Sequence, residues 1–294
     1  MAKRVRLVGG TLGERAMLVD LSVSRWDGRR KDKTVSEEVA ANKRGDRDAG
    51  AWWTHLVPRS ALKGVFAAEL AGRMAHYKHS LPWTDAGQRV LPAANYLEYM
   101  KLMRKCEERF REATEEFLMN YPDIKARAQS RLGDLYKPGD FPRVADLRSR
   151  FVWQVQVMPM PEAGDFRVQL GDAETKRIRG EIDDMVNQRL HAATKDLWDR
   201  LYASIQHVVE RLGDPQNVFR DSLISNVSEL CDLLPRLNVT GDPELERTRK
   251  EVVAKLGKLR PAEIRHNKVE RRKAADAAKD IMERMKGFMG HETK

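Results

Sequence analysis

The sequence predicts a mainly α-helical protein with a small antiparallel β-sheet (α+β). Two long segments, residues 92–121 and 172–212, carry apolar residues at steps of three and four, as helices with one buried side do. Three shorter segments, near residues 17–24, 151–158 and 165–170, alternate apolar and polar side chains as half-buried strands do. We therefore expect an elongated helical bundle built on the two long helices, with the strands joined in one small sheet.

The segment over residues 172–212 is the strongest helix signal in the chain. Its apolar residues recur slightly less often than every 3.6 residues, which argues against a strict heptad and for ordinary bundle packing. A helix of this length spans about 60 Å, so a comparably long partner is needed to bury its apolar stripe. The helix over residues 92–121 is the expected partner. The stripe consists of Ile178, Ile182, Val186, Leu190, Ala193, Leu197, Leu201, Ile205, Val208 and Leu212.

The first ninety residues are less regular. Residues 5–8 suggest a short strand, residues 26–33 a turn followed by a basic cluster, residues 34–41 a short helix and residues 42–51 a polar loop. Pro58 then begins a helix. The expected buried side of that helix consists of Leu62, Phe66, Leu70, Met74 and Tyr77.

The remaining segments follow the same helix signals. Residues 82–92 read as a connector, and the helix after it is expected to stop at Tyr121, because a residue before proline disfavours helical geometry. Asp242 and Pro243 mark a strong helix start, with a capping carboxylate and a proline in the first turn. We expect one domain over residues 1–260 and a basic C-terminal helix or tail over residues 261–294.

Composition places the chain among charge-rich proteins of a reducing compartment. The 294 residues carry a net charge of +10, which favours an acidic partner such as nucleic acid, although solvated helix faces explain it equally well. Two cysteines, Cys106 and Cys231, lie in helical patterns and are expected to be buried thiols. No apolar run approaches the about 20 residues that span a bilayer, and the N-terminus does not resemble a signal peptide. We expect a cytoplasmic protein with no membrane partner.

The sequence shows no catalytic signature. His76 and His79 lack a third ligand at a spacing typical of zinc, and residues 9–13 lack the Lys-Ser/Thr ending of a phosphate-binding loop. The neighbouring carboxylates Asp183 and Asp184 point in different directions on a helix, so they do not form an acid–base pair. We therefore expect no enzymatic activity, no cofactor and no metal.

Two basic clusters are the candidate functional features. The first combines aromatic rings with phosphate donors, which is what sequence-independent binding of a single strand requires. Its residues are Trp26, Arg29, Arg30, Lys31, Lys33, Trp52 and Trp53. The second is a basic helical face near the C-terminus, which includes Lys268, Arg271, Arg272 and Lys273. In the alternative interpretation, the tryptophans cover the sheet and the charges keep the protein soluble.

Several segments resemble an uncharacterised family of phage- and prophage-encoded proteins. They are the strand and basic turn over residues 19–31, and residues 219–227 and 234–243. The resemblance covers most of the chain up to about residue 256. The resemblance implies that the gene lies beside genes for a MoxR-type AAA+ ATPase and a von Willebrand A-type protein. It therefore also implies that the protein is a partner or adaptor of a remodelling ATPase. The family has no agreed activity, so no functional residue is transferred from it.

These observations predict a non-enzymatic, phage-type accessory protein of a bacterial host. It is expected to bind nucleic acid, DNA or RNA, through the basic loop and the basic tail. The alternative is a protein–protein adaptor or oligomeric scaffold that works with an AAA+ ATPase. If the apolar stripes outnumber the surfaces that one chain can cover, the protein forms an oligomer, and we expect a homo-oligomer.

Overall fold

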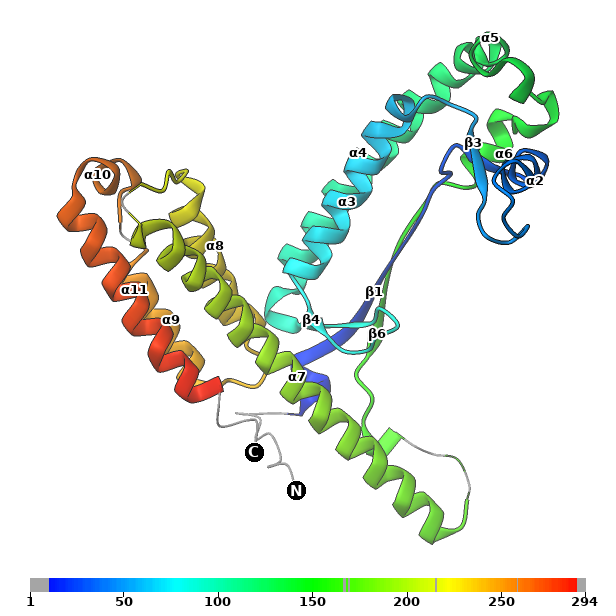
Figure 1. Cartoon of the computed structure of the whole chain (residues 1–294). Coiled ribbons are helices and arrows are strands. Elements are labelled where there is room, and N and C mark those ends of the chain that lie inside the picture. Colours follow the sequence, from blue (N-terminus) through cyan, green and yellow to red (C-terminus); the bar gives the residue numbers. More distant parts are fainter. Residues whose placement is uncertain (1–10, 166–167, 169, 215, 258, 290–294) are drawn as a thin grey trace. The chain divides into compact units, whose positions relative to one another are not determined.

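The computed structural model of the protein describes residues 11–165, 168, 170–214, 216–257 and 259–289. The expected fold class is confirmed, because long helices dominate and the strands form one four-stranded and one two-stranded antiparallel sheet (Figure 1). Within these residues, none of the helices combines the length and the apolarity that crossing a bilayer requires.

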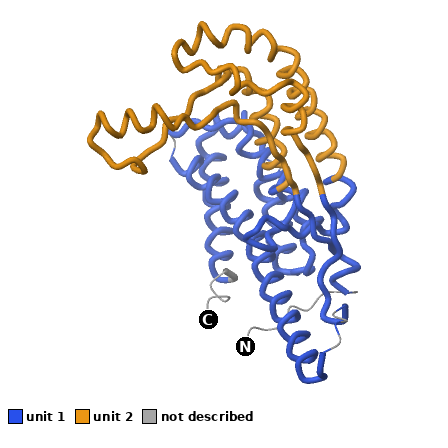
Figure 2. Tube along the Cα trace, turned by 90° about the vertical axis from the view of Figure 1, so that its right-hand side faces the viewer, with its two compact units in different colours: residues 1–20, 77–99, 156–294 blue, residues 21–76, 100–155 orange. Residues whose placement is uncertain are grey.

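The chain divides into two compact units, coloured blue (unit 1) and orange (unit 2) in Figure 2. Unit 1 comprises residues 1–20, 77–99 and 156–294, and unit 2 comprises residues 21–76 and 100–155. Both units are therefore discontinuous in sequence. This division differs from the expected single domain over residues 1–260 with a separate tail, because the C-terminal helix is part of the core of unit 1.

Five helices form most of unit 1. They are α7 (Asp172–Gly213), α8 (Ser222–Leu237), α9 (Pro243–Lys255), α10 (Pro261–His266) and α11 (Lys268–Met289). α7 packs against α11 and α8, and α9 packs against the same two helices. The expected pairing of α7 with the helix over residues 92–121 is therefore wrong. α11 turns the small side chains of Ala274, Ala275 and Ala278 into the core, which lets two helices approach closely.

The predicted stripe of α7 is confirmed over its C-terminal half. Leu190 and the later stripe residues as far as Leu212 are buried, whereas Ile178, Ile182 and Val186 are only half-buried. The predicted start of α9 is also confirmed. The Asp242 carboxylate accepts hydrogen bonds from two free amides of the first turn, and it also accepts one from the Trp198 indole at 2.9 Å.

The four-stranded sheet has the order β4-β5-β1-β6. Its strands are β1 (Ala16–Ser24), β4 (Leu81–Pro82), β5 (Arg89–Pro92) and β6 (Val152–Pro159). The expected strands near residues 17–24 and 151–158 are confirmed. β4 and β5 occupy the expected connector, and β5 pairs with β1 from Ala16↔Pro92 to Val19↔Arg89. The expected strand over 165–170 includes residues 166, 167 and 169, which lie outside the described residues, as do residues 5–8.

Three short helical elements complete the description of unit 1. They are α1 (Leu12–Arg15), η2 (Ala93–Asn95) and η5 (Ala163–Asp165). Cys231 is buried in this unit and Cys106 is buried in α4 (Tyr96–Ala126), and both thiols are free as expected. Burial raises the pKa of the Cys231 thiol to about 11, so the thiolate is scarce at neutral pH.

Unit 2 is built on α3 (Lys63–Lys78) and α4 (Tyr96–Ala126), both of which begin or end in unit 1. α4 runs through Pro122, so the expected stop at Tyr121 is wrong; a proline this close to a helix end removes only one of the last hydrogen bonds. The smaller elements of unit 2 are β2 (Arg29–Asp32), α2 (Lys33–Asn42), β3 (Trp52–His55), η1 (Arg59–Leu62), α5 (Ala128–Leu132), η3 (Gly133–Leu135), η4 (Pro138–Asp140) and α6 (Val144–Arg148).

The buried side of α3 is not the one that the apolar spacing predicts. Leu62 is buried as expected, but Leu70 is 60% exposed and Met74 is 63% exposed, and Tyr77 is also exposed. The helix instead buries Gly72, because the Trp153 ring lies directly against this residue. A Cβ added at residue 72 would be 2.1 Å from that ring. The large indole thus selects the side of α3 that faces the core of unit 2.

Candidate nucleic-acid interface

The first basic cluster lies on a two-stranded antiparallel ribbon formed by β2 and β3. The register pairs Arg29 with His55 and Lys31 with Trp53. Directly opposed residues of an antiparallel pair share a face, and so do alternate residues of one strand. Arg29, Lys31, Trp53 and His55 therefore lie on one face, which we call the cationic face. Arg30, Asp32, Trp52 and Thr54 lie on the opposite face.

A glycine turn and a helix cap hold the ribbon in place. Gly28 adopts a positive φ of 69°, which favours glycine, and its carbonyl accepts a hydrogen bond from the Leu56 amide at 2.8 Å. At the other end, Asp32 caps α2 by accepting from the Val35 amide at 3.2 Å. The Ser36 hydroxyl of α2 accepts from the Trp52 amide at 2.8 Å, which ties the helix to β3.

The cationic face combines an exposed indole with charged side chains. Trp53 is 45% exposed, and the Arg29 guanidinium lies over its ring at 4.9 Å from the ring centre. Arg29 also forms an ion pair with Asp27 at 2.6 Å, which fixes the guanidinium beside the ring. Lys31 is exposed, and no ion pair is formed by it within the described part of the chain. This face therefore offers a flat apolar ring flanked by cations.

The opposite face of the ribbon uses its charges within the protein. Arg30 forms an ion pair with Asp140, whose side chain is buried. Asp32 pairs with Lys137 at 3.0 Å, and this hydrogen bond is the main reason why the pKa of Asp32 lies below its ordinary value. Thr54 is buried, but Trp52 is as exposed as Trp53. The two neighbouring tryptophans thus present equal areas in different electrostatic surroundings.

His55 adds a titratable group to the cationic face. Burial, followed by the positive charges of Arg59, Arg29 and Arg131, lowers its pKa below the ordinary value of 6.5. His55 is therefore neutral at pH 7. The Arg59 guanidinium lies 3.3 Å from His55 Nε2, and Arg131 donates to the Leu56 carbonyl at 2.7 Å. Neither arginine was predicted from sequence: Arg59 of η1 follows soon after β3, whereas Arg131 of α5 is far from the basic cluster along the chain.

Trp26 is not part of this surface, which corrects the interpretation of the first cluster. Its side chain is 6% exposed, and its ring contacts Phe117 at 6.0 Å and Tyr121 at 5.9 Å between ring centres. It belongs to the aromatic core of unit 2 and is not available for stacking on a base. Lys33 is exposed at the first turn of α2, immediately after the ribbon.

The second basic cluster, on α11, does not form one surface. Arg271 is 8% exposed and donates to four carbonyls, those of Arg211, Leu212, Asp214 and Asn217, at 2.8, 3.1, 2.5 and 2.8 Å. These carbonyls end α7 or follow it, so Arg271 satisfies acceptors that a helix terminus leaves free. Lys268, Arg272 and Lys273 are exposed, as predicted, and Lys273 pairs with Glu270 at 2.9 Å. The prediction of Arg271 as a phosphate contact is therefore wrong.

The positive charge of the chain is concentrated in unit 2. This unit carries 23 basic and 16 acidic side chains, so it holds +7 of the net charge of +10. The ribbon belongs to this unit, whereas the cluster on α11 belongs to unit 1. An anionic ligand is therefore attracted more strongly by the unit that bears the cationic face.

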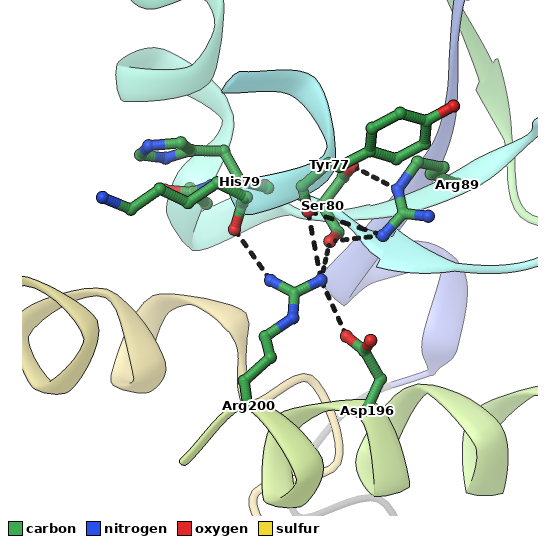
Figure 3. A network of polar contacts seen from close by, with 8 residues as sticks. Tyr77, His79, Ser80, Arg89, Asp196 and Arg200 are labelled. Carbon is green, nitrogen blue, oxygen red and sulfur yellow. Dashed lines mark hydrogen bonds and ion pairs between the residues drawn. The ribbon is translucent and has the colours of Figure 1, made fainter. Parts of the chain in front are cut away.

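Arg200 and Arg89 form a polar network in unit 1 that satisfies the free carbonyls at the end of α3. Arg200 of α7 donates to the carbonyls of Tyr77, Lys78 and Ser80 at 3.1, 2.8 and 2.9 Å, where α3 ends. Figure 3 shows Arg200 beside Tyr77 and Ser80. Arg89 donates to the Ser80 hydroxyl oxygen at 2.8 Å, so that oxygen faces a cation rather than a base. We therefore assign no nucleophilic role to Ser80.

No metal-binding cluster is found in the described residues, since none of their His, Cys, Asp and Glu side chains form a group of three or more with suitable geometry. Comparison of the chain with protein-family models, with curated proteins and with solved structures finds no match. The resemblance to phage-encoded proteins therefore stays a prediction, and the geometry of the ribbon carries the functional argument.

Proposed function

We propose that the protein binds single-stranded nucleic acid through the cationic face of the ribbon, as a binding protein and not as an enzyme. The observation that carries the proposal is the cross-strand register, which brings Arg29, Lys31 and Trp53 together on one exposed face. An exposed indole beside cations supports base stacking together with phosphate contact. The bases of a duplex are already stacked on one another, so this chemistry favours a single strand.

The proposed test is fluorescence anisotropy with labelled single-stranded and duplex oligonucleotides of about twenty nucleotides, as DNA and as RNA. We expect log affinity to fall linearly with log salt, because phosphate contacts release counterions, and single strands to bind more tightly than duplexes. The variant with Arg29, Arg30 and Lys31 changed to Ala should bind more weakly with a shallower salt slope. No binding to any of these oligonucleotides at low salt would overturn the proposal.

The second candidate function is that of a protein–protein adaptor, as the resemblance implies for an AAA+ ATPase. One observation favours it: the apolar side chains of Leu70 and Met74 are exposed on α3, where a partner has room to cover them. Trp53→Ala separates the two functions, because Trp53 does not line the groove beside Leu70 and an adaptor would keep its partner after this change. We also propose the cytoplasm as the site of either function.

A further inference from the structure

A groove in unit 2 adjoins the cationic face and shares Arg29 and His55 with it, but most of its remaining lining is apolar. It has a volume of about 590 Å³ and lies where β3 is followed by the first turns of α3. Binding pockets for ligands commonly measure about 300–1,000 Å³. We call it the α3 groove. Its apolar lining consists of Val57, Pro58, Leu62, Phe66, Ala67 and Leu70.

The apolar lining continues along α3 beyond the groove. Leu62, Phe66, Leu70 and Met74 follow one another at steps of four, so they lie along one side of the helix. Leu62 is buried at the base of the groove, whereas Leu70 and Met74 are more than half exposed. Single exposed apolar residues are common, but a row that runs out of a groove is typical of an interaction site.

Cations surround this apolar lining. Arg25, Arg29, Arg59 and Lys63 line the groove, against one acidic lining residue, Asp27. Glu69 neutralises part of this charge through its ion pair with Arg25. The surplus of positive charge remains after both acids are counted, so the groove is complementary to a ligand that is apolar and acidic.

We propose that the α3 groove binds an amphipathic segment of a partner protein, in which apolar side chains are flanked by Asp and Glu. The apolar side chains would cover Ala67 and Leu70, which are exposed, and the carboxylates would face Arg59 and Lys63. The groove is unsuited to nucleobases, because its apolar walls are largely aliphatic. This inference does not rest on the nucleic-acid proposal.

The test uses two fluorescent synthetic helices that share a stripe of leucines, one with Glu and one with Lys at the remaining positions. Fluorescence anisotropy with the full-length protein should show that the Glu helix binds about tenfold or more tightly than the Lys helix. Leu70→Glu places a carboxylate on the apolar wall and should weaken binding of the Glu helix about tenfold. Lys63→Glu should weaken the Glu helix and strengthen the Lys helix.

Met119→Glu is the matched control, because Met119 is an exposed apolar residue of α4 in the same unit and does not line the groove. It adds the same charge and should leave binding of the Glu helix unchanged. Circular dichroism of Leu70→Glu should match that of the wild type, since Leu70 is largely exposed. Trp53→Ala should still bind the Glu helix but should bind the oligonucleotide more weakly, which separates the two proposals.

Three results would overturn the inference. The first is equal binding of the Glu and Lys helices, or equal effects of Leu70→Glu and Met119→Glu. The second is self-association of the wild type in sedimentation equilibrium that Leu70→Glu abolishes, which would assign the groove to a second copy of the chain. The third is loss of oligonucleotide binding in Leu70→Glu, which would assign the groove to nucleic acid.

Discussion

The triplet Arg-Arg-Lys occurs twice in the chain, in β2 and in α11, and the two copies have different structural roles. In β2, strand alternation places Arg29 and Lys31 on one exposed face and turns Arg30 toward the buried carboxylate of Asp140. In α11, Arg271 points into the core of unit 1, while Arg272 and Lys273 are exposed. The triplet in β2 therefore contributes to a charged surface, whereas the triplet in α11 links α11 to the end of α7 in the core of unit 1.

This difference follows from the period of the backbone. Successive side chains of a strand alternate between two faces, so every second charge of a short strand shares a surface. Successive side chains of a helix turn by about 100°, so three adjacent charges spread around most of its circumference. The meaning of a basic triplet is thus set by the element that carries it, and its composition alone does not predict a binding site.

The largest expected effect is on stability and comes from Arg271→Ala. The change removes charged donors from four carbonyls around the end of α7 and should lower the free energy of unfolding by about 2–4 kcal/mol. Urea unfolding followed by circular dichroism measures the loss. Arg272→Ala is the control at an exposed neighbour and should change stability by less than about 0.5 kcal/mol. Similar losses for both variants would contradict the structural role of Arg271.

The second prediction compares the two clusters as ligand contacts. Changing Arg29 and Lys31 to Ala should weaken single-strand binding about tenfold and make the salt slope shallower by about 1.4, since each lost phosphate contact contributes about 0.7. Changing Arg272 and Lys273 to Ala removes the same number of charges from α11 and should alter neither quantity. Anisotropy titrations at several salt concentrations measure both. An equal effect of the two double variants would show that overall charge, and not the ribbon, attracts the ligand.

The third prediction separates the two faces of the ribbon. Lys31→Ala should make the salt slope shallower by about 0.7, which corresponds to one phosphate contact. Arg30→Ala should leave the slope unchanged, because Arg30 already pairs with Asp140, but it should lower the melting temperature by leaving that buried carboxylate unpaired. The same titrations, with thermal unfolding beside them, measure both effects. A smaller slope in Arg30→Ala than in Lys31→Ala would reverse the assignment of the faces.

The smallest expected effect depends on pH. The pKa of His55 lies below 6.5, chiefly because of burial, so a proton adds a cation to the cationic face only below that pH. Affinity for a single strand should therefore rise about twofold as the pH is lowered well below 6.5, and His55→Ala should remove this rise. Because the folded state depresses this pKa, the same protonation destabilises the fold as the pH falls through about 6.5. A rise that persists in His55→Ala would assign it to another group.

The helices and two of the sheet strands were predictable because their apolar residues repeat over many positions. β2 and β3 were not, because Arg29–Asp32 and Trp52–His55 have four residues each and show no alternation of apolar and polar side chains. The pairing of these strands depends on the Gly28 turn and on α2 between them. The basic cluster was therefore identified from composition, but its division into two faces was not.

The burial of Arg271 had a signal in the sequence. Arg271 precedes Ala274, Ala275 and Ala278 at steps of three, four and seven, so it lies on the apolar side of the same helix. On α3 the opposite happened, since the apolar spacing predicted burial of Leu70 and the structure exposes it. The decisive contact there is between Gly72 and Trp153, two residues that are far apart in sequence.

The most direct test of the central claim is a comparison of Trp53→Ala with Trp52→Ala. The two residues are adjacent and each is 45% exposed, but they lie on opposite faces of the ribbon. Binding of a labelled single strand should weaken by about 1–3 kcal/mol in Trp53→Ala, the usual loss for one stacked base, and should be unchanged in Trp52→Ala. Equal losses in the two variants, or a loss in Trp52→Ala alone, would contradict the assignment of the cationic face.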